Sequence, residues 1–441
     1  KDKMPAKLSA IAVTLATLVL VPGILASENW GDHSRAERYT GRDYAKNYLD
    51  SCEPNAILFT NGDNDTFPLW YVQEVEEYRT DVRVINLSLL NTDWYINQMR
   101  KKAYESDPVP LTLPEKKIRQ GTNDYLPVYQ RDQIKGHIDV QDLINFILSD
   151  NQQTKVSVGN GRKIDYIPSK KLKIKVDKEK VLANGTVPAD MADQIVDEVK
   201  WTINKNYVLK NDLTVLDILA SNNWERPIYF ASTTGSASYI GLEDYFRAEG
   251  MTYRLVPIKK NDRSDGNPGF VDADILYDRK MNDFHWGGVD TSDVYMDETN
   301  RRMNMSMRMT FSRLADQLIK EGETAKAEEV VDKAFEVMPE HNVPYDIFVL
   351  YLAENYYQVG ADEKANKIAE RLVDIYEKEV IYYNSLEPEY ARQLQRDKQQ
   401  ALAVLNQLVV FTNQMYPQGE FGKELSQRLS PYLGAVNQQS R

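Results

Sequence analysis

The sequence predicts a mixed α/β domain, an all-helical domain after it and one membrane-spanning helix before both. An uncharged apolar run covers residues 8–26. Short apolar runs then alternate with helical periods up to about residue 258, which is typical of Rossmann-like strand–helix–strand units with a mixed sheet. Beyond residue 300 only the helical period remains. We therefore divide the chain into an apolar helix at 1–27, an α/β domain at 28–258, a connector at 259–300 and a helical domain at 301–441.

The apolar run is long enough to cross a bilayer once, because a spanning helix needs about 20 mostly apolar residues. Lysines precede the run and acidic residues follow it. The positive-inside bias therefore places its N-terminal end in the cytoplasm and the body of the chain on the far side. A cleaved secretory signal that starts at Met4 is the alternative, although Ile24 and Ala26 form only half of the expected small-residue cleavage pattern. Both interpretations export the body.

Composition excludes several classes of function. The chain has 441 residues and a net charge of −12, which argues against general nucleic-acid binding because phosphate neutralisation needs a basic surface. Cys52 is the only cysteine, so no intramolecular disulfide can form and thiol catalysis has little support. The four histidines do not occur at metal-ligand spacings, and no P-loop or G-x-S-x-G elbow is present.

The α/β domain is predicted from two similar units. The first unit has helices at 42–49 and 66–77 and strands at 56–60 and 82–87. Its length of about thirty residues suits a right-handed crossover between parallel strands. The second unit has helices at 213–220 and 239–249 and strands at 227–231 and 253–258.

Between the two units, the apolar and polar residues alternate. The segments 155–158, 164–167 and 171–176 show this period, which predicts antiparallel strands at a sheet edge or in a small subdomain. Asn184-Gly185 is typical of a turn. Residues 190–201 show a short helical period, so we expect a helix there.

The connector and the helical domain follow. The connector at 259–300 is rich in turn formers but carries several aromatic residues, so we expect an ordered loop over the first domain. In the helical domain, Gly322, Ala327, Ala334 and Pro339 lie at spacings of 5, 7 and 5. These spacings match the small-residue and proline positions of a tetratricopeptide unit. A second, degenerate unit begins at Gly360, and a closing helix is predicted at 396–416. About two repeats are too few for a stable array, so we expect these helices to pack on the α/β domain or on a partner.

The most informative local feature is the segment Asn-Gly-Asp-Asn-Asp-Thr at 61–66, which follows a predicted strand and opens a helix. Ligand sites of open α/β sheets lie at such strand ends. Asp63 and Asp65 are oxygen ligands suited to a divalent cation, and free amides at the helix start suit an anion. A structural role explains the same residues, since Asp65 or Thr66 makes a good N-cap and Pro68 suits a first helical turn. We weigh this structural role above the other two.

The next predicted strand ends in a comparable loop at 91–95. Adjacent parallel strands bring such loops together, so we expect one cleft with Asp63, Asp65 and Asp93 on its floor and aromatic side chains as its walls. The hydroxyl-rich loop at 232–236 would join this cleft. Aromatic rings beside carboxylates are typical of sugar-binding sites and also of core edges. The candidate cleft residues are Asp63, Asp65, Thr66, Trp70, Asp93, Trp94 and Tyr95.

Three segments, at 61–71, 81–95 and 222–231, resemble the exported C-terminal region of large Bacteroidota membrane proteins. These proteins were long labelled a family of unknown function. They are related to the animal transmembrane protein O-mannosyltransferases, which are multi-spanning enzymes that use lipid-linked sugar donors. The resemblance covers nearly the whole chain.

The resemblance implies that the apolar run is the last transmembrane helix of a longer polypeptide in a bacterial inner membrane, with the bulk of the chain in the periplasm. The catalytic module would precede Lys1 and would hold the lipid-linked sugar. The catalytic acid of such enzymes lies in that module, so no residue here inherits its role, and this region is not expected to be catalytic by itself. The resemblance implies that this region recognises or positions an exported protein or peptide acceptor.

Two other hypotheses stay open. The first is a non-enzymatic envelope scaffold that binds peptides through its tetratricopeptide-like helices. The second is a metal-dependent hydrolase or transferase that uses the acidic loop at 61–66 together with Asp93. Only the second hypothesis requires a divalent cation as cofactor.

Overall fold

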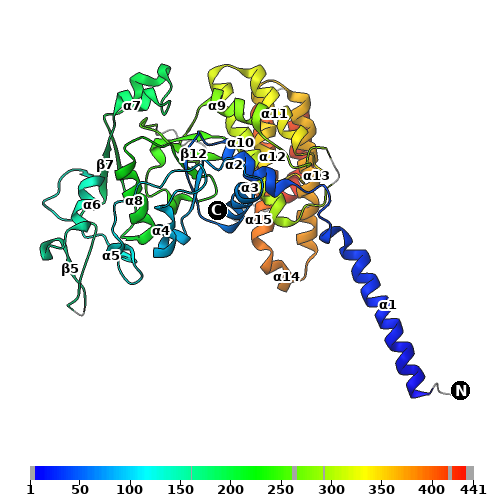
Figure 1. Ribbon diagram of the computed structural model, residues 1–441. Coiled ribbons are helices and arrows are strands. Elements are labelled where there is room, and N and C mark those ends of the chain that lie inside the picture. The colour runs from blue at the N-terminus through cyan, green and yellow to red at the C-terminus, as the bar shows by residue number, and fades with distance from the viewer. Residues whose placement is uncertain (1–4, 160, 261–265, 292–293, 416–419, 434–441) are drawn as a thin grey trace.

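The computed structural model describes residues 5–159, 161–260, 266–291, 294–415 and 420–433. Figure 1 shows a body with two halves, in which the α/β elements lie beside a stack of longer helices, and one helix projects from this body. The predicted fold class is therefore confirmed: a mixed α/β region, an all-helical C-terminal region and one apolar N-terminal helix.

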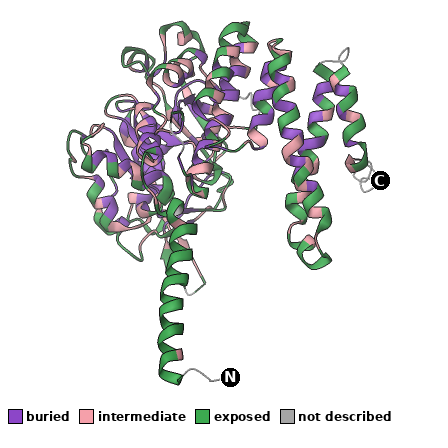
Figure 2. Ribbon diagram, turned by 90° about the vertical axis from the view of Figure 1, so that its right-hand side faces the viewer, coloured by how far each residue is buried: buried purple, intermediate pink, exposed green. Residues whose placement is uncertain are grey.

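The projecting helix is α1 (Ala6–His33), and its apolar side chains are exposed along its length (Figure 2). By length and composition, residues 6–31 are able to cross a membrane, and a signal sequence near an N-terminus passes the same test. The structure thus confirms one apolar helix, while the choice between anchor and signal stays open.

The α/β region is built on a mixed sheet in the order β13-β11-β12-β10-β1-β2. Strand β1 pairs in parallel with both of its neighbours, and its Leu58 lies opposite Val84 of β2 and Tyr229 of β10. Strand β12 pairs antiparallel with β10 and β11, and β13 lies parallel to β11. The strands of this sheet are β1 (Ile57–Thr60), β2 (Arg83–Asn86), β10 (Ile228–Ala231), β11 (Phe246–Glu249), β12 (Thr252–Leu255) and β13 (Phe270–Val271). The predicted parallel unit at 56–87 is confirmed.

Both faces of this sheet are buried, because successive strand residues point to opposite sides. Leu58 and Tyr229 belong to one hydrophobic core, and Phe59 and Phe230 belong to a second core on the other face. The first face is covered by α2 (Thr40–Asp50), α3 (Asp63–Val75), α9 (Ala273–Asp278) and α10 (Glu298–Glu321). The second face is covered by α6 (Val140–Leu148) and α8 (Lys210–Asn222).

Smaller elements lie between β2 and α8. Strands β5 and β6 form an antiparallel pair, and so do β3 and β9, while β7 lies between β4 and β8. Antiparallel strands were expected in this part of the chain. The elements are α4 (Asp93–Met99), α5 (Glu115–Ile118), β3 (Tyr125–Pro127), β4 (Ile138–Asp139), β5 (Val156–Ser157), β6 (Lys163–Ile164), β7 (Lys171–Lys175), α7 (Lys178–Ala183), β8 (Glu198–Thr202) and β9 (Tyr207–Leu209).

Two predicted helices are wrong. Residues 190–201 contain a 3₁₀ turn and then β8, in which buried Val199 and Trp201 alternate with more exposed neighbours. Residues 239–249 contain a 3₁₀ turn and then β11, which forms a hairpin with β12. The second unit is therefore antiparallel. Arg247 and Glu249 of β11 are both buried and paired with each other at 2.5 Å.

The C-terminal region is all-helical, as predicted. Gly322 ends α10 in the left-handed conformation (φ 84°), and Gly360 follows α12 in the same conformation (φ 80°). Ala327 and Ala365 are fully buried, as their spacing predicts for closely packed helices. Assignment of these helices to the tetratricopeptide family stays a prediction, and Tyr416 of the predicted closing helix lies outside the described residues. The helices are α11 (Thr324–Val337), α12 (Ile347–Gln358), α13 (Asp362–Ser385), α14 (Pro388–Gln393), α15 (Gln395–Met415) and α16 (Glu420–Leu433).

One lysine is buried where the two regions meet. Lys280 lies in the π-helical turn after α9 and is 1% exposed. Its ammonium donates a hydrogen bond to Thr310 of α10 at 2.5 Å and lies 4.4 Å from the ring centroid of Phe311. Burial lowers the pKa of Lys280 to about 7. The charged form is thus disfavoured in the folded state relative to the unfolded state.

We expect the Lys280→Met substitution to flatten the pH dependence of stability between pH 7 and 9. In this range the unfolded chain binds more protons at this position than the folded chain, so wild-type stability rises with pH, by up to about 1.4 kcal/mol per pH unit. Urea unfolding in detergent micelles measures this slope. The exposed Lys367→Met variant is the control and should keep it. An unchanged slope in Lys280→Met would contradict the assignment.

A candidate site at the carboxyl ends of the parallel strands

The connections beside strand β1 lie on opposite faces of the sheet. The connection from β1 to β2 runs through α3 on one face of the sheet, whereas α8 precedes β10 and covers the other face. Open α/β sheets bind ligands where neighbouring connections diverge like this. The loops at 61–66 and 232–236 follow β1 and β10 at this point. We call these two loops the switch-point site.

A buried carboxylate joins the two loops. Thr233 donates a hydrogen bond from its Oγ1 to Oδ2 of Asp65 at 2.7 Å, and the Asn61 amide lies 3.4 Å from the same oxygen. Asp65 is only 3% exposed. The hydroxyl of Tyr48 on α2 lies 3.2 Å from Ser232 Oγ and 3.3 Å from Thr233 Oγ1. Burial raises the pKa of Tyr48 well above its usual value, so this hydroxyl stays protonated.

Thr66 belongs to a second buried network that joins β1, β2 and α3. Its Oγ1 lies 2.8 Å from Thr60 Oγ1 and accepts a hydrogen bond from Asn86 Nδ2 at 2.9 Å. The backbone amide of Asn86 donates to the Tyr95 hydroxyl at 3.0 Å. Tyr95 is 5% exposed, and burial raises its pKa to about 12. Thr66 and Tyr95 therefore hold the sheet end together from within.

The remaining candidates divide into exposed and anchored residues. Asp63 is exposed in the first turn of α3, where the positive end of the helix dipole favours a carboxylate. Trp70 is half-buried between the two cores, beside the exposed ring of Phe67 at 5.6 Å. Trp94 is 54% exposed. Asp93 accepts hydrogen bonds from the backbone amides of Gln120 at 3.1 Å and Trp94 at 2.8 Å, and these bonds lower its pKa.

The three aspartates do not form a common ligand set. Within the described ranges, no group of three or more histidine, cysteine, aspartate or glutamate side chains is arranged to hold a metal ion. Asp65 is bonded to Thr233, and Asp93 holds the backbone at Gln120. The alternative of a cation held by Asp63 and Asp65 alone stays a prediction.

Sequence reasoning missed Tyr48 and Asn86, which support the site from α2 and β2. Asn86 has a sequence signal, because it is a polar residue near the carboxyl end of a mainly apolar predicted strand. Tyr48 has none, since its position beside Ser232 depends on the packing of α2 against the sheet.

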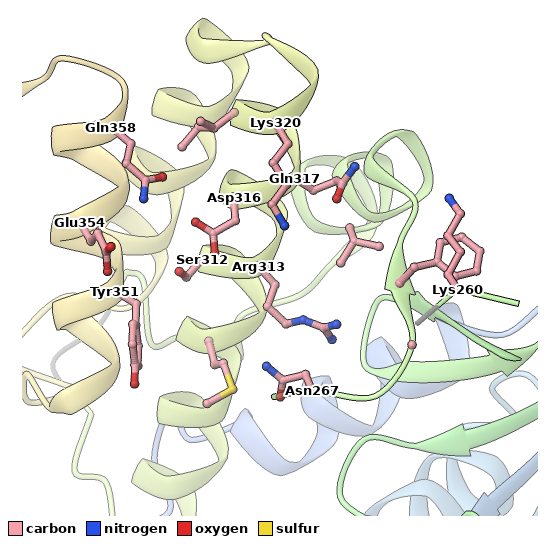
Figure 3. Close-up of a pocket in the computed structure, with 15 residues that line it drawn as sticks. Lys260, Asn267, Ser312, Arg313, Asp316, Gln317, Lys320, Tyr351, Glu354 and Gln358 are labelled. Carbon is pink, nitrogen blue, oxygen red and sulfur yellow. The ribbon is translucent and has the colours of Figure 1, made fainter. Parts of the chain in front are cut away.

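A hollow lies between the α/β region and the helical region, and it was not predicted from the sequence. We call it the junction groove. It is bounded by α10, by α12 and by residues 267–271, and its volume is about 830 Å³. Figure 3 shows polar side chains from both helices pointing into it.

The fold is a mixed α/β domain in which two bonded loops lie at the carboxyl ends of adjacent parallel strands, where ligand sites of open α/β sheets usually lie. The family model named TMEM260-associated domain 2 matches residues 41–275, more than half of the chain. The chain therefore belongs to this family. The match runs from α2 into α9 and includes the whole switch-point site. No curated protein and no solved structure matches the chain.

Replacing Asp65 with alanine should destabilise the domain. The change leaves the Thr233 hydroxyl without its carboxylate and cuts the link between the two loops, at a cost of about 1–3 kcal/mol in the free energy of unfolding. The Asp63→Ala variant changes an exposed carboxylate in the same helical turn, so its effect should stay within about 0.5 kcal/mol. Urea titrations followed by circular dichroism compare the two. Equal effects would show that the bond to Thr233 contributes nothing.

Proposed function

We propose that this chain is the exported region of a membrane glycosyltransferase, and that it recognises or positions a protein acceptor while a multi-spanning module holds a lipid-linked sugar. The observation that carries the proposal is the family match over residues 41–275. TMEM260 is linked to protein O-mannosyltransferase-like proteins. On this proposal, the body lies in the periplasm and α1 ties it to the inner membrane.

The positions of the family-like segments support this proposal. Residues 61–71 form the first switch-point loop and most of α3, and residues 81–95 form β2 and the turn into α4. Both segments therefore gather at the carboxyl ends of the parallel strands. Ligand sites of open α/β sheets lie at this edge, so we place the recognition surface of this region there.

Exposed aromatic side chains that suit a protein partner lie on the two helices that follow these strands, α3 and α4. Phe67, Tyr71 and Trp94 are 53%, 47% and 54% exposed. Aromatic side chains contribute a large share of the binding energy at protein interfaces. A helix that ties the body to the membrane also raises the effective concentration of the body beside any other membrane-bound module. We assign the acceptor-binding role to this aromatic edge, and no catalytic role to any residue of the chain.

The test uses cells that make the complete protein from its own gene. Deletion of the gene should remove O-linked sugar from a set of exported proteins, measured by mass spectrometry of their peptides. The double variant Phe67→Ala/Trp94→Ala should lower the same modification, at unchanged protein level, because it removes the aromatic edge. Tyr382→Ala is the matched control, since it removes an aromatic ring that is 56% exposed on α13.

Each outcome is informative. Unchanged modification after gene deletion would reject the transferase proposal and favour the envelope scaffold. Loss on deletion with no effect of the double variant would reject the aromatic edge as the acceptor surface. Loss in Tyr382→Ala as well would show that the effect is not specific to this edge.

A further inference from the structure

The junction groove is lined mostly by polar side chains, which is unusual for a space between two helices. Arg313, Asp316 and Lys320 follow one another on α10 at i, i+3 and i+7. Tyr351, Glu354 and Gln358 follow the same spacing on α12. A stripe at this spacing is usually apolar where a helix faces other elements. Figure 3 shows both stripes turned toward the common space.

The polar groups of α10 are held in place by other parts of the chain. Arg313 is only 8% exposed, and its guanidinium donates a hydrogen bond to the Pro268 carbonyl at 3.3 Å. Asp316 accepts a hydrogen bond from Asn355 of α12 at 2.6 Å. A ligand therefore meets groups that are already oriented, which reduces the entropy lost on binding.

The charges in the groove are mixed and nearly balanced. The cationic groups of Lys260, Arg313 and Lys320 lie among the carboxylates of Asp316 and Glu354. Such a wall does not favour a multiply charged anion, and its polarity does not favour a hydrocarbon chain. It suits a neutral ligand that both donates and accepts many hydrogen bonds.

An aromatic ring on α12 supplies the apolar contact. Tyr351 is 41% exposed and lines the groove one turn before Glu354. A tyrosine ring combines an apolar face with a polar edge, so it suits a ligand with both characters. The pKa of Glu354 is raised by burial and by the negative charge of Asp316. Hydroxyl donors from a ligand would stabilise both carboxylates.

We propose that the junction groove binds a saccharide. The Tyr351 ring packs against the apolar face of a sugar ring, Asp316 and Glu354 accept hydrogen bonds from its hydroxyls, and Arg313 donates to them. The groove volume lies within the range of about 300–1,000 Å³ that is usual for small-ligand sites. The inference goes beyond the proposed function and does not depend on it, because a transferase region and a scaffold could both use such a site.

Binding is measured on the full chain in a detergent without sugar groups, since alkyl glycosides would compete. The probes are methyl glycosides of mannose, glucose and galactose and their disaccharides, observed by saturation-transfer NMR and titrated by calorimetry. At least one probe should bind the wild type. Tyr351→Ala and the isosteric Glu354→Gln should each weaken that binding about tenfold or more, a change of about 1.4 kcal/mol.

Tyr382→Ala on α13 is the matched control and should leave the affinity unchanged. Circular dichroism of each variant verifies the fold, and Glu354→Gln keeps the test valid if Tyr351→Ala fails to fold. No binding by any probe would overturn the proposal, and so would binding that survives both groove substitutions.

A second comparison separates two sources of the sugar. A peptide that carries the preferred sugar is compared with the methyl glycoside and with the bare peptide. Tighter binding of the glycopeptide supports a protein-linked glycan, and equal binding of the glycopeptide and the glycoside supports a free saccharide. Equal binding of the bare peptide and the glycopeptide overturns the proposal. None of these measurements uses transferase activity, so their failure is distinct from a failure of the proposed function.

Discussion

The central constraint on this structure is that both faces of its six-stranded sheet carry buried side chains and must be covered. Strands that are buried on both sides cannot face water. Helices α6 and α8 cover one face, and helices α2, α3, α9 and α10 cover the other. Because α10 is also the first helix of the C-terminal region, one hydrophobic core runs from Tyr44 to Leu429. The helical region is therefore anchored to the sheet, as expected for an array too short to be stable alone.

The same sheet explains why the candidate site lies where it does. Strand β1 lies between its two parallel neighbours, β10 and β2, which are reached over opposite faces, so the loops that follow β1 and β10 diverge. The bond between Thr233 and Asp65 bridges these loops at their base, while Asp63 stays exposed. The two acids of this segment thus differ: Asp65 is buried and joins the two loops, whereas Asp63 is exposed at the start of α3.

The spacing of apolar residues predicted those elements in which it follows a single helical or strand period. Strands β1, β2 and β10 and helices α2, α3 and α8 were found in this way. The pattern failed at β11, because Glu249 is buried and bonded to Arg247 and, at 2.8 Å, to the hydroxyl of Tyr229 on another strand. The loops at 61–66 and 232–236 were expected to meet at this sheet edge, and the bond between Thr233 and Asp65 joins them there, whereas their use as a binding site stays a prediction. The distant partners of Asp65 and Asp93, Thr233 and Gln120, could not be identified from local spacing. The junction groove was not predicted at all, because three distant segments form it.

The junction between the two regions combines strong apolar packing with polar groups that weaken it. Trp286 and Phe311 pack at 5.7 Å between ring centroids. Buried Lys280 lies 4.4 Å from the Phe311 ring, and buried Arg313 lies on the same helix as Phe311. Apolar residues of similar size would stabilise such an interface more, since buried charges lose hydration. The ammonium of Lys280 contacts Thr310 and aromatic rings, and Lys280 does not line the groove. Arg313 instead borders an open groove lined with further polar groups. Arg313 and Asp316 are held in place by Pro268 and Asn355 and still line an open groove, and this is why we place recognition of a ligand at the junction as well as at the sheet edge.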